Sequence, residues 1–541
     1  MRAESEIVAG ASAETGQTTL DRKLEVFAGE KGQQLLTSLQ RGLEKEGLRV
    51  MPDASLAQTG HPAVLGSALT NPWLTTDFSE SLFEFITPIF NTIDGMLDYL
   101  RDIHALAARN LGDERIWAAS MPCILPGDDE IPIAQYGTSN SARMKTTYRV
   151  GLGHRYGRAM QTVAGIHYNF SMPAEYWQAS FEKDHGHAHS SENELQQYIN
   201  VRYLDLIRNF RRNYWLLIYL LGAAPCFDRS FIQGREHRMD NLGEKDLYLP
   251  DATSLRMGDL GYQSEAQKSL FVCYNDLETY ITTLGEALHI SYPEYEKIGV
   301  VVDGEYQQLS TALLQIENEF YSPIRPKRVT QRGETPLRAL ADRGIEYVEV
   351  RCLDINPFMS LGIDAETIRF LDAFLLFCLS SESTLCDQEE FANISENQAR
   401  IVNQGRDPDI QVYCGKKEIA MRECARHMLD GIARVAGLFD QAHGTSQYRD
   451  SVDRQKAKID DVSLTPSAQI LAEMHDNNES HIDFTQRKTS QFASEFANFD
   501  LDTDIEQALL SQAEQSHQDQ AALEADQSTS FEDFLAAYFN Q

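Results

Sequence analysis

Hydrophobic and polar residues alternate with a period of two along short segments in the first two thirds of the chain. In residues 41–50, RGLEKEGLRV, Glu44 and Glu46 share one face of an expected strand, because successive side chains on a strand point to opposite faces. In residues 81–87, SLFEFIT, Glu84 shares its face with aliphatic residues, and aromatic residues occupy the other face. The alternation predicts strands that carry their acidic groups on a single face.

Two further segments show the same alternation. Residues 166–171, IHYNFS, place His167 and Asn169 on one face, and residues 345–352, IEYVEVRC, carry Glu349. Each acid taken alone has the alternative of a solvated surface position, and the histidine has the alternative of a place in the core. Because the pattern recurs on four strands, one shared functional site is favoured over a separate explanation for each residue.

Strands paired side by side in one antiparallel sheet would bring these polar residues into one cavity. Crowded carboxylates raise one another's pKa unless cations lie among them. Oxygen ligands with one imidazole suit Mg²⁺ or Mn²⁺. We therefore expect a site for divalent metal, formed by Glu44, Glu46, Asp77, Glu84, His167 and Glu349.

The later part of the chain has a helical period. From about residue 364 onward, apolar residues recur at spacings of three and four. After Lys488 the chain has eleven acidic residues and no lysine or arginine, although apolar residues still recur at helical spacing. The run at 214–225 is too short to span a membrane and predicts a buried helix. We expect an α+β protein with a polar leader (1–20) and one large domain (21–541), in which a sheet-and-helix core (21–360) precedes a mostly helical, acidic part (361–541).

Charge and cysteine content narrow the functions that fit. The 541 residues include 48 Lys and Arg and 81 Asp and Glu, a net charge of −33, which repels nucleic acids and anionic membranes. The eight cysteines are scattered without a C-x-x-C motif, and no apolar signal segment opens the chain. We expect a reduced, cytoplasmic protein without nucleic-acid or membrane partners.

Against this acidic background one short segment is basic. Residues 323–328, PIRPKR, include Lys327 and Arg328 and are either a solvated loop or a phosphate-binding segment. Together with Arg351 and a metal site, they would provide the groups that phosphoryl transfer requires. A second unusual segment carries His185, His187 and His189; an exposed insertion loop is favoured over a metal site there.

Several ordered motifs resemble the proteobacterial type of glutamate–cysteine ligase. They are QRGLEKE (40–46), TGHP (59–62), LGSALT (65–70), TTDF (75–78), AQYGTSN (134–140), IHYNFS (166–171), QIENE (315–319), IRPKR (324–328) and GIEYVEVR (344–351). The resemblance implies a fold related to glutamine synthetase, with an antiparallel sheet that forms a funnel and helices packed outside it. It also implies that ATP phosphorylates the side-chain carboxylate of glutamate and that the amine of cysteine attacks the γ-glutamyl phosphate, in the first step of glutathione synthesis.

The resemblance assigns roles to individual residues. The six expected ligands would hold more than one Mg²⁺, Arg351 would face the transferring phosphoryl group, and Arg149 and Arg256 would meet substrate or phosphate charge. The cysteine pocket would contain Phe78, Tyr148, Gln161, Asn169, Tyr262 and Tyr321; for the aromatic members, core packing is the alternative. A monomer inhibited by glutathione is expected, with no covalent enzyme intermediate. Two alternatives are a ligase of the same scaffold that uses another amine and an inactive, nucleotide-binding regulatory protein.

Overall fold

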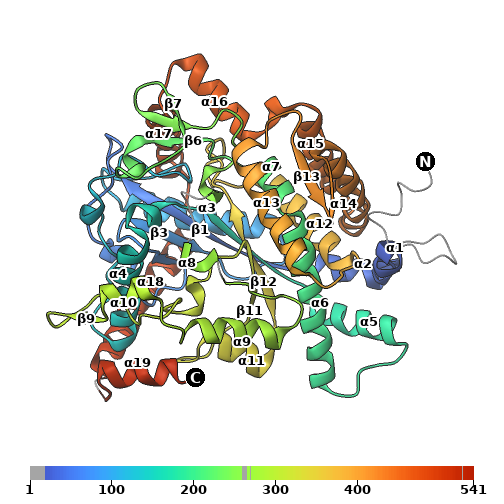
Figure 1. Ribbon diagram of the computed structural model, residues 1–541, viewed down its shortest axis with the longest axis horizontal. Coiled ribbons are helices and arrows are strands. Elements are labelled where there is room, and N and C mark those ends of the chain that lie inside the picture. Colours follow the sequence, from blue (N-terminus) through green and yellow to red (C-terminus); the bar gives the residue numbers. More distant parts are fainter. Residues whose placement is uncertain (1–18, 259–264, 269, 527) are drawn as a thin grey trace.

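The computed structural model describes residues 19–258, 265–268, 270–526 and 528–541, and a seven-stranded sheet lies at its centre (Figure 1). The strand order is β11-β12-β5-β1-β3-β2, with β4 also paired to β1, and every pairing is antiparallel. The strands are β1 (Gln40–Val50), β2 (Leu74–Thr76), β3 (Leu82–Ile86), β4 (Arg115–Ile116), β5 (Ile166–Ser171), β11 (Ile324–Lys327) and β12 (Tyr347–Leu353). The expected mixture of helices with an antiparallel sheet is confirmed.

Helices surround this sheet. Those of the first 360 residues are α1 (Thr19–Leu24), α2 (Gly29–Thr37), α3 (Ile93–Arg109), α4 (Asn140–Tyr156), α5 (Ala174–His185), α6 (Glu192–Asn213), α7 (Trp215–Leu221), α8 (Glu265–Lys268), α9 (Leu277–Ala287), α10 (Pro293–Ile298) and α11 (Pro336–Arg343). Two small sheets accompany them, formed by β6 (Cys226–Asp228), β7 (Asp240–Leu242) and β8 (Asp246–Tyr248), and by β9 (Val301–Val302) and β10 (Glu305–Tyr306). The predicted buried helix is α7, which ends where Gly222 begins the turn into β6.

The later part of the chain is mostly helical, as predicted. Its helices are α12 (Ala365–Ser380), α13 (Gln388–Gln404), α14 (Met421–His443), α15 (Gln447–Asp460), α16 (Pro466–Asn477), α17 (His481–Ala497), α18 (Thr503–Ala525) and α19 (Phe531–Phe539). A hairpin of β13 (Gln411–Cys414) and β14 (Lys417–Ala420) interrupts them. The acidic tail packs against the rest through buried Leu509, Phe531 and Leu535, and α19 contacts α4.

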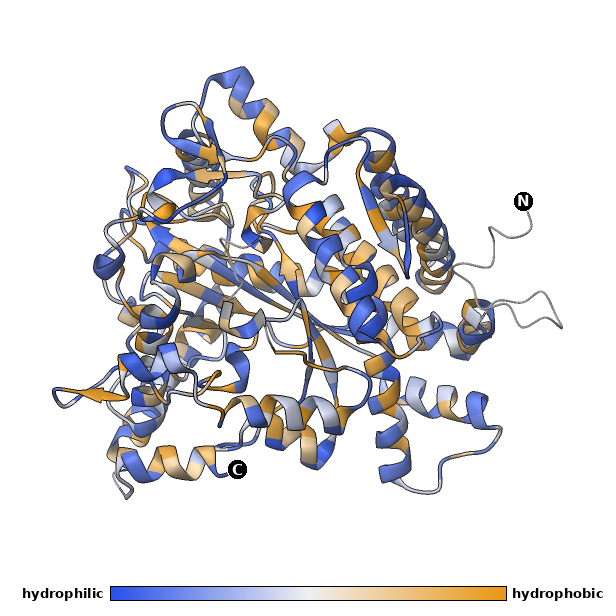
Figure 2. Ribbon diagram, viewed as in Figure 1, coloured by the Kyte–Doolittle hydropathy of each residue, from blue (hydrophilic) through white to orange (hydrophobic). Residues whose placement is uncertain are grey.

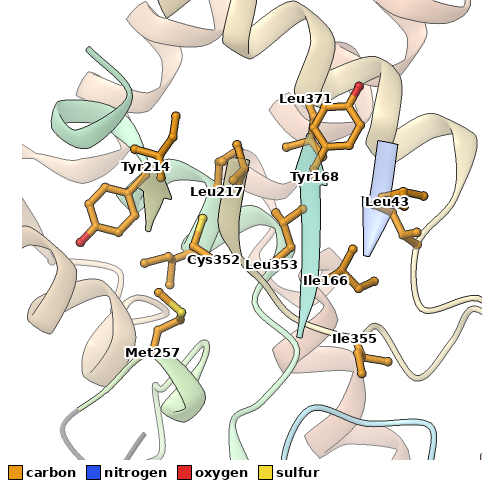
Figure 3. Packing of buried hydrophobic residues seen from close by; sticks show 14 of the residues in the cluster. Leu43, Ile166, Tyr168, Tyr214, Leu217, Met257, Cys352, Leu353, Ile355 and Leu371 are labelled. Carbon is orange, nitrogen blue, oxygen red and sulfur yellow. The ribbon is translucent and has the colours of Figure 1, made fainter. Parts of the chain in front are cut away.

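The core lies where the apolar faces of the strands meet the helices. Leu43 of β1, Tyr168 of β5, Leu353 of β12 and Leu371 of α12 are all buried there, and Figure 3 labels them among the packed residues. Figure 2 shows hydrophilic residues along much of the peripheral helices, α15 and α16 among them. The alternation along each strand therefore separates an apolar side, held by helices, from the polar side described below.

A buried ion pair ties the sheet to α12. The guanidinium of Arg41, at the start of β1, donates to both carboxylate oxygens of Asp372, with a shortest distance of 2.7 Å. The hydroxyl of Tyr168 on β5 also donates to Asp372. Arg41 and Asp372 are both buried, so each charge depends on the other for compensation.

The histidine-bearing segment is the largely exposed connection between α5 and α6, in agreement with the favoured exposed loop, although His185 still belongs to α5. His185 ends α5, and its ring stacks on Phe181 with ring centroids 4.2 Å apart. His187 and His189 approach the same phenylalanine edge-on. Within the described ranges, these histidines are not among the residues grouped closely enough to hold a metal ion. The predicted leader lies outside the described residues, apart from its last two positions, which begin α1.

Candidate active site

Strand register brings the acidic groups together. Glu44 of β1 pairs with His167 of β5, and Glu46 of β1 pairs with Glu84 of β3 on the other side. Glu349 of β12 pairs with Asn169 of β5. The result is one cavity of about 680 Å³ that all six expected metal ligands line: Glu44, Glu46, Asp77, Glu84, His167 and Glu349.

His167 lies at the centre of this cluster. Its Nδ1 is 3.1 Å from Glu44 Oε2 and 3.8 Å from Glu349 Oε1, and its Nε2 is 3.7 Å from Glu46 Oε1. Ligand atoms of Glu44, Glu84 and His167 all lie within 4.8 Å of one another. This donor set of carboxylate oxygens and one imidazole fits Mg²⁺ or Mn²⁺.

Two carboxyl groups of the cluster, those of Glu46 and Glu84, lie in surroundings that disfavour their charged forms. Burial, together with the nearby Glu44 and Asp77 carboxylates, raises the pKa of Glu84 well above its usual value. Burial also raises the pKa of Glu46, whose Oε2 accepts a hydrogen bond of 2.6 Å from the Gly165 amide. Cations among these groups would relieve the repulsion, which is the physical reason to expect divalent metal here.

The neighbouring side of the cavity is cationic. Glu349 lies 3.2 Å from Arg351 Nη1 and 3.6 Å from Lys327 Nζ. Although burial opposes it, the charge of Lys327 and then that of Arg351 hold the pKa of Glu349 well below its usual value. Arg325, which shares its strand face with Lys327, also lines the cavity. An anionic group such as a phosphate would be bound here.

Helix α4 forms another wall. Lys145, Tyr148 and Arg149 lie one turn apart on its inner face and line the cavity. The Nε of Arg149 donates to the backbone carbonyl of Asp77, and burial lowers the pKa of Lys145 to about 8. Lys145 is not among the site residues predicted from the sequence, although its spacing of four residues from Arg149 places both on one helix face.

Most residues expected around the cysteine pocket line the cavity. Phe78, Tyr148, Gln161 and Tyr321 all do so. The backbone amide of Tyr321 donates to Gln267 Oε1 at 3.0 Å, which fixes the chain at this point. Tyr262 lies outside the described residues.

Three expected site residues lie outside the described lining of the cavity. Arg256 is buried beneath it, with Nη1 3.5 Å from Asp354 Oδ1 and Nη2 donating to the carbonyl of Arg351. The Nδ2 of Asn169 donates to Glu44 Oε1 at 3.0 Å, so Asn169 orients a carboxylate of the cluster. Arg328 follows the end of β11 and pairs with Glu346 at 3.6 Å. Arg325 lines the cavity in place of the expected Arg328. It is two residues before Lys327, and alternate residues of a strand share a face.

Comparison with known proteins gives consistent matches over most of the chain. A family model described as glutamate-cysteine ligase matches residues 24–401. A glutamate–cysteine ligase of Pseudomonas entomophila is 46% identical over 519 residues, which are 96% of this chain and 97% of that protein. One from Alcanivorax borkumensis is 45% identical over 526 residues, 96% of this chain and 99% of that protein.

Two solved structures have a fold similar to that of this chain. The crystal structure of glutamate–cysteine ligase from Francisella tularensis in complex with AMP superposes with a TM-score of 0.87 and 34% identity, covering 93% of this chain and 98% of that one. A bifunctional glutathione synthetase from Pasteurella multocida shares the fold, with a TM-score of 0.68 and 24% identity over 87% of this chain and 55% of that one. Of the helices in the described ranges, none is both long and apolar enough to cross a membrane.

Proposed function

The chain belongs to the glutamate–cysteine ligase family, and from this premise we propose that it joins L-glutamate to L-cysteine at the expense of ATP. The product is γ-glutamylcysteine, formed through γ-glutamyl phosphate in the first step of glutathione biosynthesis. The observation that carries the proposal is one cavity in which a cluster of carboxylates adjoins the cationic side chains Arg325, Lys327 and Arg351. Such a cavity suits metal-assisted phosphoryl transfer.

The acidic cluster would hold the divalent ions. The ligands we propose are Glu44, Glu46, Asp77, Glu84, His167 and Glu349. When bound, Mg²⁺ or Mn²⁺ would neutralise the triphosphate and reduce its repulsion of the incoming glutamate carboxylate. Asn169 would keep Glu44 in place through its hydrogen bond, as supporting partners of metal ligands do elsewhere.

The cationic side would bind the transferring phosphoryl group. Arg351 presents a planar guanidinium that can contact two phosphoryl oxygens, and Lys327 adds a point charge. Glu349 contacts both cations and so fixes them at the cavity wall. Fixed charges stabilise the charge that develops in transfer without the cost of reorientation.

The two chemical steps then follow from the substrates. An oxygen of the glutamate side-chain carboxylate attacks the γ-phosphorus of ATP, and ADP leaves. The amine of cysteine next attacks the carbonyl carbon of this acyl phosphate; the amide bond forms, phosphate leaves and the amine gives up a proton. Tyr148, Phe78 and Tyr321 would enclose cysteine and exclude water from the acyl phosphate, while Arg149 would meet substrate charge at the α4 wall.

The experiment that tests this proposal measures phosphate release with MgATP and each amino acid separately and then together. We expect rapid release only when glutamate and cysteine are both present, with a matching amount of γ-glutamylcysteine. Replacing cysteine by α-aminobutyrate, alanine or glycine tests the choice of amine. Equal or faster turnover with one of these amines would overturn the assignment of cysteine.

Membership of this family supports further proposals about the protein. We propose that the protein works in the cytoplasm as a monomer, that residues 21–541 form one ligase domain and that its sheet is related to that of glutamine synthetase. Glutathione, which contains the γ-glutamyl group, would inhibit by competing with glutamate. Initial rates at several concentrations of both compounds test this: a glutathione effect that high glutamate leaves unchanged would contradict it.

A further inference from the structure

A second cavity lies behind the sheet, on the side away from the acidic cluster. It has a volume of about 250 Å³ and shares none of its described lining residues with the first cavity. Strand β1, the segment 111–118 that includes β4, helices α3 and α17, and the segment 355–360 form its walls. At about 30 Å³ for each water molecule, it has room for a ligand of roughly eight water volumes.

Lys45 brings its amino group to this cavity. It stands between Glu44 and Glu46 on β1 and therefore points to the opposite face of the sheet, where it is only 3% exposed. Its Nζ lies 2.9 Å from His104 Nε2. Among the described residues, no carboxylate forms an ion pair with Lys45. Burial without a counter-charge disfavours the ammonium form and lowers the pKa of Lys45 to about 7. A carboxylate bound beside Nζ would supply the missing counter-charge and accept its hydrogen bonds.

His104 holds Lys45 toward the cavity without supplying negative charge. The Nδ1 of His104 is 2.8 Å from the carbonyl of Leu100, which assigns the ring proton to Nδ1 and makes Nε2 the acceptor for Lys45. The imidazole ring stacks on Phe85 with centroids 3.9 Å apart. Burial lowers the pKa of His104 well below its usual value, so the ring is neutral. One N–H of Lys45 is thus used, and two remain for a ligand.

The other groups at this cavity also favour an anion. Half-exposed Arg115 adds a guanidinium, which is always charged, and no ion pair forms between it and a carboxylate of the described residues. Glu114, the acid in the lining, lies 2.6 Å from buried Arg49 and is therefore compensated already. Apolar and aromatic groups make up much of the remaining wall: Ala108, Leu111, Ile116, Trp117, Phe492 and Phe496.

We propose that this cavity is a second binding site, for a small monocarboxylate with an apolar body. The carboxylate would accept hydrogen bonds from Lys45, and the body would contact the apolar wall between α3 and α17. A cavity of this kind, mostly apolar with one convergent polar group, is the usual form of a small-ligand site. The site is separate from the proposed active site, because the sheet lies between them.

The test measures binding of benzoate and isovalerate to the full-length protein by ligand-detected NMR, with benzamide and isovaleramide as uncharged counterparts. Glutamate and a non-hydrolysable ATP analogue with Mg²⁺ are present at saturation, so that the first cavity is filled. We expect both carboxylates to bind and the two amides to bind at least tenfold more weakly. No binding, or equal binding of acid and amide, would overturn the proposal.

Three variants locate the bound ligand. Lys45→Met, which is similar in length, should weaken carboxylate binding at least tenfold, and Ala493→Phe should do the same by filling the cavity from α17. Lys145→Met, in the first cavity, should leave binding unchanged. Wild-type affinity in both Lys45→Met and Ala493→Phe, or displacement of benzoate by the active-site ligands, would place the carboxylate elsewhere and overturn the proposal.

Discussion

Glu46 and Glu84 lie directly opposite each other on the adjacent antiparallel strands β1 and β3. Like charges in this position destabilise a sheet, and burial raises the pKa of both groups. A fold optimised for stability alone would not place two buried acids here. Their cost is explained if divalent ions occupy the cavity in the working enzyme.

Replacing Glu84 by glutamine tests this explanation. Glu84→Gln keeps the shape of the side chain and removes a charge, so we expect turnover to fall by about 100-fold or more while the metal-free protein stays at least as stable as wild type. Mg²⁺ should raise the melting temperature of wild type more than that of the variant. Thermal unfolding with Mg²⁺ and with EDTA, combined with steady-state kinetics, measures both effects.

The matched control is Glu175→Gln, an exposed acid on α5. It should change neither turnover nor the response to Mg²⁺. Full activity in Glu84→Gln would remove this residue from the proposed metal site.

Arg351→Lys tests the proposed phosphoryl contact. Lysine keeps the charge but cannot form the planar, two-pronged contact of a guanidinium, so we expect kcat to fall by roughly 100-fold with little change in the KM for cysteine. Stopped or coupled assays of ADP formation provide the measurement. Arg338→Lys, at an exposed ion pair on α11, should behave as wild type; the same behaviour in Arg351→Lys would refute the assigned role.

The buried pair of Arg41 and Asp372 is predicted to control stability. Asp372→Ala leaves the Arg41 guanidinium buried without its partner, which should lower the free energy of unfolding by about 3–5 kcal/mol. Urea unfolding followed by circular dichroism measures this change. Asp98→Ala removes an exposed partner of Arg101 and should cost less than about 1 kcal/mol. A similar small cost for Asp372→Ala would show that the network contributes little.

His481 predicts an acid-sensitive contribution to stability. Burial lowers its pKa from 6.5 to about 4 in the folded protein. Between these values the unfolded chain binds more protons, so stability is lost as the pH falls. Over the interval from pH 7 to pH 5 the contribution of this group should fall by about 2 kcal/mol.

Urea unfolding of wild type and His481→Gln at both pH values measures this effect. The variant should lose about 2 kcal/mol less than wild type over the interval. An equal loss in the two proteins would show that His481 is not responsible.

The alternation of residues along β1, β3, β5 and β12 was enough to predict which acidic groups share a face. Period two is a local property, so Glu44, Glu46, Glu84 and Glu349 could be selected without knowing the sheet. The strand order could not be predicted in this way. The position of β5 between β1 and β12 depends on pairing between segments more than 100 residues apart. The repeated pattern was the only basis for expecting these strands side by side.

The alternating pattern of the strands does not predict other parts of the site. Lys145 belongs to a helix whose hydrophobic pattern is weak, so only its spacing of four residues from Arg149 indicates the face that meets the cavity. Arg325 and Arg328 are both basic, and only the end of β11 at Lys327 decides that Arg325 shares the inward face. Arg256 has the right charge but is covered by the strand that carries Arg351.

The position of Lys45 between Glu44 and Glu46 restricts how the gene for this protein can change. Inserting or deleting a single codon ahead of Lys45 would turn that lysine into the acidic cavity and drive both glutamates into the apolar side of the sheet. Changes of two codons would keep the phase of the strand. Natural length variation in this segment should therefore occur in even steps, whereas single-residue shifts would disrupt both the proposed metal site and the apolar side of the sheet.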